Sequence, residues 1–179
     1  GTTVAATPAS IAIGGDTSTS GNYTAGSHTI TPSAAAGTYG YALSYETGTL
    51  TVSAKTITTS GLSASNKVYN NSTAASLTGT AVLTNGATAD NDNQYYTGDT
   101  VSLTGTASGA FADKNVGTGK AVSITGLSLT GTDATNYNLS ITASSADITV
   151  KTITTSGLAA DNKVYNNSTA ASLTGTAVL

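Results

Sequence analysis

The acidic residues of one polar segment are the first candidates for chemistry in this chain. Asp90, Asp92 and Asp99 lie between residues 88 and 99, interleaved with asparagines. Oxygen ligands at alternating loop positions are a set that binds Ca²⁺, although the pattern lacks the bidentate glutamate of an EF-hand. The segment therefore predicts either a calcium site or an ordinary solvated loop, and no other cofactor is expected.

Two adjacent tyrosines in the same segment are candidates for contact with a sugar. Tyr95 and Tyr96 follow the acidic residues directly, and their rings could stack on a glycan. Tyr69 and Tyr137 lie instead within apparent strands, where tyrosine is favoured for packing and for anchoring sandwich corners. We therefore expect Tyr69 and Tyr137 in the core or at a corner, and a glycan contact at Tyr95 and Tyr96.

Hydrolytic chemistry is not expected. A triad requires a base, an orienting carboxylate and a nucleophile, and His28 is the only histidine. It lies in a Thr-rich strand pattern, where we expect a surface or edge residue. Lys67 and Lys163 precede Val-Tyr pairs and could form Lys–Asn isopeptide bonds beside a carboxylate; the alternative is a surface lysine. We predict that the chain is not an enzyme.

Short β-strands must position these residues. Ala75, Leu77 and Ala81 alternate with threonine and serine, which is the period of a half-buried strand. Asn85-Gly86 predicts a tight turn, Gly126 a bulge, and Phe111 a core residue. About seven such strands occur per repeat, without helical periodicity. The pattern predicts an all-β chain of tandem immunoglobulin-like β-sandwich modules, end to end, with a β-solenoid as the alternative.

The chain repeats itself. Residues 55–83 and 151–179 are the same 29-residue sequence except that Ser63 and Ser65 become Ala159 and Asp161. The two copies begin 96 positions apart, and Tyr41-Ala42-Leu43-Ser44 matches Tyr137-Asn138-Leu139-Ser140 at the same offset. A fixed long period is typical of repeat arrays. We predict the C-terminal part of a module in 1–54, a complete module in 55–150 and the N-terminal part of the next in 151–179.

Composition narrows the class of protein further. Charged residues are 8% of the chain, the net charge is −3 and there is no cysteine. No basic patch suits nucleic acid, and no apolar run approaches the ~18 residues of a membrane helix. Lack of cysteine excludes disulfides and thiolate metal sites. Thr-rich and Gly-rich repeats of this kind fit large exported bacterial surface proteins.

Several motifs resemble a known family. KTIT with SGL at residue 55 onwards, Lys-Val-Tyr at 67–69, GDTVSLTGTASGAFADKNVGTGKAV at 98–122 and TNYNLS at 135–140 resemble the YDG repeat of bacterial haemagglutinin-like and filamentous adhesins. Residues 38–55 are similar to the end of the related MBG repeat. Tyr69-Asn70-Asn71 replaces the family's Tyr-Asp-Gly; asparagine tolerates the left-handed turn. The resemblance implies an extracellular β-rich spacer without catalytic residues.

The function expected from the sequence is structural. We predict a segment of a long adhesin or fibre at the bacterial surface, acting as a stalk, a spacer or a matrix filament. Its expected partners are neighbouring repeats and, through lateral or end-to-end self-association, other copies. The alternative is a repeat module that binds surface glycans or ice.

Overall fold

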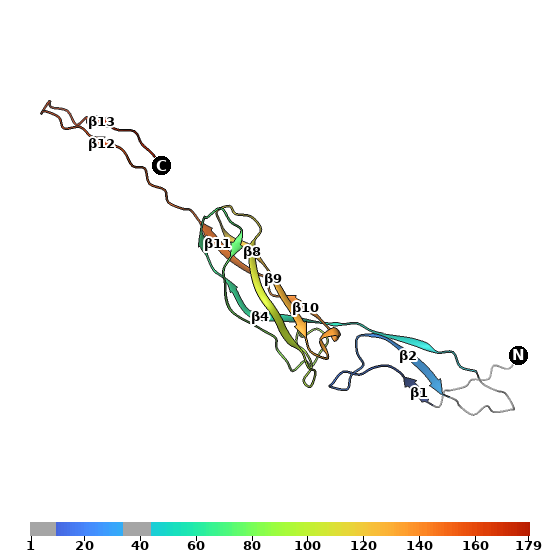
Figure 1. The fold of residues 1–179 in the computed structure, drawn as a ribbon. Helices are drawn as coiled ribbons and strands as arrows, with labels where there is room; N and C mark the ends of the chain where they lie inside the picture. Colours follow the sequence, from blue (N-terminus) through green and yellow to red (C-terminus); the bar gives the residue numbers. More distant parts are fainter. Residues whose placement is uncertain (1–9, 34–43) are drawn as a thin grey trace, which may run out of the picture.

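The structure, a computed structural model, describes residues 10–33 and 44–179. These residues form three parts that follow one another along an elongated molecule, with β1 near one end of the described chain and β13 near the other (Figure 1). Strands and loops make up almost the whole of the described chain, and the one helical element is the 3₁₀ turn η1 (Ala134–Asn136). The all-β prediction is confirmed.

The first part is a small antiparallel sheet, called here the N-terminal sheet. It consists of β1 (Ser10–Ile13), β2 (Gly26–Ser33) and β3 (Gly48–Val52) in the order β1-β2-β3. Ile13 lies opposite Ile30, and His28 lies opposite Leu50. Most of the segment with which the sequence match at Tyr41 was made lies outside the described residues.

The second part, called here the central unit, contains two sheets. Its strands are β4 (Lys55–Ala64), β5 (Lys67–Val68), β6 (Ala74–Ala75), β7 (Leu77–Val82), β8 (Ser102–Phe111), β9 (Gly117–Thr130), β10 (Tyr137–Ile141) and β11 (Ser144–Thr149). One sheet has the order β10-β4-β7 and the other the order β5-β11-β9-β8-β6. The second sheet is built on the antiparallel set β8-β9-β11, whereas a solenoid would stack successive coils.

The apolar residues of the two sheets meet in two clusters along the central unit. The first core cluster, nearer the C-terminus, contains Phe111, Val122, Ala146 and Ile148. The second core cluster, nearer the N-terminal sheet, contains Ile57, Val101 and Tyr137. Further apolar residues are partly buried against these two clusters: Ala64, Tyr69, Ala75, Leu77, Leu83, Tyr95, Tyr96 and Leu129. The predicted core positions of Phe111, Tyr69 and Tyr137 are confirmed.

A bulge interrupts the pairing of β8 with β9 where the sequence predicted it. The register shifts between Gly105 and Ser108 on β8, opposite Gly126 on β9. Gly126 has a φ of 88°, and a Cβ on it would lie 2.2 Å from the Thr106 carbonyl oxygen. Only glycine fits this close approach of two backbones. The bulge therefore depends on this residue.

The third part, called here the C-terminal hairpin, is residues 151–179. It carries only two short paired strands, β12 (Ala159–Ala160) and β13 (Leu173–Thr174). All of its residues are exposed. It extends away from the central unit at the end opposite the N-terminal sheet (Figure 1).

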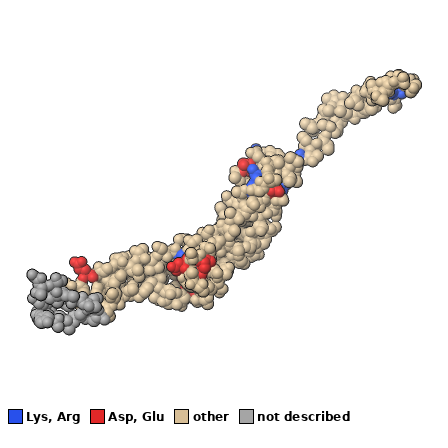
Figure 2. All heavy atoms as spheres, turned by 180° about the vertical axis from the view of Figure 1, so that it is seen from behind, with Lys and Arg blue, Asp and Glu red and all other residues tan. Residues whose placement is uncertain are grey.

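The surface of the molecule is largely uncharged. Figure 2 shows the acidic and basic side chains gathered in a few small groups on an otherwise neutral, elongated body. Within the described ranges, no helix is long and apolar enough to cross a membrane.

One residue lies where the sequence did not predict it. His28 was expected at the surface or at a sheet edge, but it is only 3% exposed. Its ring lies over Gly15, where a Cβ would come within 2.0 Å of Nδ1, and it packs against Tyr23 with ring centroids 5.2 Å apart. The prediction was wrong because an alternating pattern does not reveal that a neighbouring glycine leaves room for a side chain.

Candidate functional site

The candidate site is the junction between the N-terminal sheet and the central unit. Strand β3 ends at Val52 and β4 begins at Lys55, so only two residues separate the two units. The loop between β1 and β2, residues 14–25, reaches across to the central unit. It contacts the segments before β8 and before β10 through hydrogen bonds.

Asp133 is the central acceptor of this junction. It is 3% exposed. Its Oδ1 accepts the Thr19 backbone N–H at 3.0 Å, and its Oδ2 accepts both the Thr19 hydroxyl and the Thr100 N–H, the latter at 2.7 Å. These bonds, that of the Thr19 hydroxyl above all, lower the pKa of Asp133 below its usual range. The carboxylate therefore joins the loop of one unit to the segment just before β8 of the next.

Two further side chains of the central unit bind the same loop. Asp99 accepts the Ser20 N–H at 3.2 Å and the Tyr137 hydroxyl at 2.6 Å. Asn136 accepts the Ala25 N–H through Oδ1 at 2.8 Å. Burial, together with the bond to Asp99, raises the pKa of Tyr137 above its usual range. Polar side chains thus hold the two units together in addition to the two residues that connect β3 with β4.

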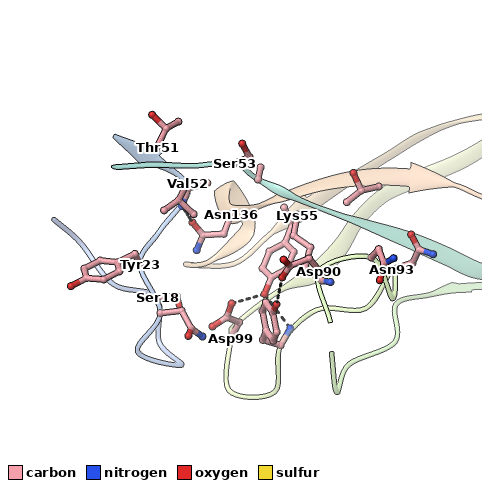
Figure 3. A pocket seen from close by; sticks show the side chains of 17 residues that line it. Ser18, Tyr23, Thr51, Val52, Ser53, Lys55, Asp90, Asn93, Asp99 and Asn136 are labelled. Atoms are coloured by element: carbon pink, nitrogen blue, oxygen red, sulfur yellow. Dashed lines mark hydrogen bonds between the residues drawn. The ribbon is translucent and has the colours of Figure 1, made fainter. Parts of the chain in front are cut away.

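A cleft of about 770 Å³ opens beside these bonds. Figure 3 shows that the N-terminal sheet supplies one wall and the central unit the other. Its lining is rich in amide, carboxylate and hydroxyl groups: Ser18, Asn22, Tyr23, Lys55, Asp90, Asn91, Asn93, Tyr96, Asp99, Asn136 and Tyr137. A cleft of this size between two units is a common place for a ligand.

The three predicted calcium ligands have separate partners. Asp92 pairs with the Lys55 ammonium at 2.9 Å and accepts the N–H groups of Thr88, Ala89 and Gln94. Lys55 and these N–H groups hold the pKa of Asp92 well below its usual range. Asp90 accepts the Tyr96 hydroxyl at 3.2 Å, while Asp99 belongs to the junction.

Within residues 10–33 and 44–179, no three acidic or histidine side chains gather as a metal site. Calcium binding therefore stays a prediction from the sequence. The segment 88–99 is a loop, as predicted, and Asp92 organises its backbone.

The two loop tyrosines differ in their surroundings. Tyr95 is partly buried against the second core cluster, and its backbone pairs with Thr84 and Gly86. Tyr96 lines the cleft, and the Lys55 ammonium lies 5.3 Å from its ring centroid. Burial and the bond to Asp90 raise the pKa of the Tyr96 hydroxyl. Of the two residues predicted to contact a glycan, only Tyr96 faces the cleft.

The remaining candidates have structural partners. His28 bonds to the Thr24 carbonyl oxygen through Nε2 at 2.6 Å. The Lys67 ammonium donates to the carbonyls of Ser72 and Ala74 and lies 5.2 Å from the centroid of the Phe111 ring. The Lys163 ammonium donates to the carbonyls of Ser168 and Ala170 and lies 3.4 Å from Oδ1 of Asn166. An isopeptide bond at either lysine stays a prediction from the sequence.

Sequence reasoning missed the junction residues Thr19, Asp133 and Asn136. The available signal was weak: Gly131-Thr132-Asp133 is a turn pattern in which an aspartate commonly accepts nearby N–H groups. Nothing in that pattern indicates a partner more than 100 residues away in another unit. The junction therefore became visible only in three dimensions.

The described chain is all-β, and residues 55–83 recur at 151–179, so the class is a β-rich protein with an internal sequence repeat. The model of the YDG domain family matches residues 53–146, and the chain belongs to that family. The YDG resemblance is thus confirmed. No curated protein and no solved structure matches the chain.

Proposed function

We propose that this chain is a structural segment of a long extracellular bacterial adhesin or fibre. In this proposal the central unit is one of a series of immunoglobulin-like modules arranged end to end, and the N-terminal sheet belongs to a neighbouring MBG-like module. The segment spans distance as a stalk or spacer, or forms a matrix filament. It works through its shape and stiffness rather than through a reaction.

The observation that carries the proposal is the bonded junction. A stalk spans a fixed distance only if successive units keep a constant orientation relative to one another. Short linkers alone do not ensure a constant orientation. Here two residues separate the strands, and three side chains, Asp99, Asp133 and Asn136, accept N–H groups of the preceding unit. The 96-residue repeat and the elongated outline agree with such a design (Figure 1).

Small-angle X-ray scattering tests the proposal. We expect chains with one, two and three copies of residues 55–150 in series to lengthen by about 40 Å per copy, from the rise of 3.3 Å per strand residue. Linear growth of the maximum dimension supports a stalk. A dimension that stays constant as copies are added would refute it.

Replacement of Asp133 tests the junction itself. Asp133→Ala leaves the Thr19 and Thr100 N–H groups without their acceptor, and we expect a loss of about 1–3 kcal/mol in the free energy of unfolding. We also expect a broader distribution of dimensions in scattering. Asp113→Ala is the matched control, because Asp113 pairs with Lys120 away from this junction. If the Asp133→Ala and Asp113→Ala chains have the same distribution of dimensions in scattering, the proposed role of Asp133 is contradicted.

A further inference from the structure

The cleft at the junction has unused hydrogen-bonding groups. The side-chain amides of Asn91 and Asn93 line it, and neither has a hydrogen-bond partner among the described residues. Asn136 uses its Oδ1 for the Ala25 N–H, so its amide nitrogen remains to donate. Asp90 uses Oδ1 for Tyr96 and keeps Oδ2. Together these groups offer both donors and acceptors to a ligand.

The charge of the lining restricts the ligand. Asp90 and Asp99 bring two carboxylates to the cleft. Lys55 is the one cationic side chain of the lining, and its charge is paired with that of Asp92, which does not line the cleft. Phosphate groups, nucleic acid and acidic sugars would meet uncompensated negative charge. An anionic ligand is therefore disfavoured.

The apolar part of the lining consists of small aliphatic side chains and tyrosine rings. Its aliphatic residues are Ala25, Val52 and Ala54, which offer little surface to a lipid or to an apolar peptide side chain. The ring of Tyr96 has the Lys55 ammonium near one face and packs against the core. The ring of Tyr96 therefore offers little surface for stacking, and the proposal depends on the hydrogen-bonding groups.

We propose that this cleft binds a short neutral glycan. Its vicinal hydroxyl groups would pair with the amides of Asn91, Asn93 and Asn136 and with the free oxygen of Asp90. Both units contribute to the lining, so a bound sugar would lie between them, with the hydrogen bonds named above made to the central unit. This site is additional to the proposed stalk function, and stalk behaviour in scattering would survive the failure of the glycan proposal.

Binding to the intact chain is the first measurement. The chain 1–179 is titrated with neutral gluco-, galacto- and manno-oligosaccharides, observed by saturation-transfer NMR and calorimetry, with a sialylated oligosaccharide and an uncharged peptide as comparisons. We expect binding of at least one neutral oligosaccharide and of neither comparison ligand. Absence of binding at millimolar concentrations, or preference for the peptide or the acidic sugar, would overturn the proposal.

Matched variants then locate the site. Asn91→Ala combined with Asn93→Gly removes two amides, and glycine accepts the φ of 61° at residue 93. We expect affinity to fall at least about tenfold, as for the loss of two hydrogen bonds. Asn115→Ala, in the β8–β9 turn, removes an exposed asparagine outside the cleft and should change affinity less than about twofold. Equal affinities of the two variants would place any binding elsewhere and refute this site.

Discussion

The same sequence occurs twice in this molecule in two different environments. Residues 55–83 pack into the central unit, where Ile57 is 1% exposed, whereas in the C-terminal hairpin the equivalent Ile153 is 68% exposed. Tyr69 packs against the first core cluster, while its equivalent Tyr165 is 88% exposed. The apolar residues of this segment therefore become a core only beside the strands of residues 84–150.

Local structure is nevertheless the same in both copies. Gly61 and Gly157 have φ values of 87° and 85°, and Asn71 and Asn167 have values of 61° and 53°. Lys67 and Lys163 each donate to two carbonyls of the following turn. Because these features involve only residues close in sequence, they do not need the rest of the unit.

The strands differ between the copies. β4 runs for 10 residues between β10 and β7, while its counterpart in the hairpin has only the two residues of β12 in a strand. Isolated two-stranded hairpins are marginally stable in water. Long strands in this segment thus require a neighbouring strand, here β10, to complete the sheet.

The largest expected effect comes from supplying the missing neighbour. If a second copy of residues 84–150 is joined after Leu179, the hairpin should pack as residues 55–83 do. We expect slow hydrogen exchange at the amides of Ile153 and Leu158, as at those of Ile57 and Leu62. The matched control carries the same residues in scrambled order. Continued fast exchange in the hairpin would show that the two copies differ for another reason.

Core truncation should separate the copies next. Ile57→Ala removes a fully buried side chain and should lower the free energy of unfolding by about 2–5 kcal/mol. Ile153→Ala removes the same atoms from an exposed position, and we expect a change within about 0.5 kcal/mol. Chemical denaturation measures both. Similar losses in the two variants would mean that the hairpin is packed in solution.

A glycine replacement should affect both copies alike. A Cβ at Gly61 would lie 2.2 Å from the Thr80 carbonyl oxygen, and one at Gly157 would lie 2.4 Å from that of Thr176. Gly61→Ala and Gly157→Ala each place alanine at a positive φ, at a cost of about 1–2 kcal/mol before the contact is counted. NMR chemical shifts should show local distortion in each copy. Undisturbed shifts around residue 157 would indicate that this hairpin geometry is not formed independently.

Acid should have the smallest effect, and only on the packed copy. Lys55 pairs with Asp92, whose folded-state pKa is depressed, so this pairing contributes stability above the unfolded pKa of about 3.9 that is lost as the pH falls below it. Between pH 5 and 2 we expect the protection of the loop 88–94 amides against exchange, measured relative to the intrinsic rate at each pH, to decrease. The lysine–carbonyl bonds of the hairpin should not respond.

Asp92→Asn is the control for the acid experiment. This variant cannot titrate at residue 92, so its loop should show a weaker dependence on pH over the same interval. A dependence as steep as in the unchanged chain would assign the effect to another carboxylate, such as Asp133, whose pKa is also lowered.

Much of the architecture could be predicted from particular residues. Alternation around Leu77 predicted a strand, Gly126 predicted the bulge, and Phe111 predicted the core. These predictions succeeded because side-chain periodicity and backbone tolerance are properties of a short stretch of chain. The prediction for His28 failed because its burial depends on Gly15, which lies on a different segment.

The candidate site was predictable only in part. Tyr96 and Asp90 were identified from the sequence and do line the cleft. Asp92 was read as a metal ligand, whereas the structure shows it bound to Lys55 and three N–H groups. Asp133 was not identified, since its partner Thr19 precedes it by 114 residues. Long-range polar pairs leave no periodic signal.

The sequence by itself determined the β-rich character of the chain, its 96-residue repeat and the turns at Asn71 and Asn167. Tertiary structure decided which copy of the repeat became a core and where two units joined. The physical reason is range: backbone conformation depends on adjacent atoms, whereas burial and shared hydrogen bonds require surfaces that only the folded chain brings together.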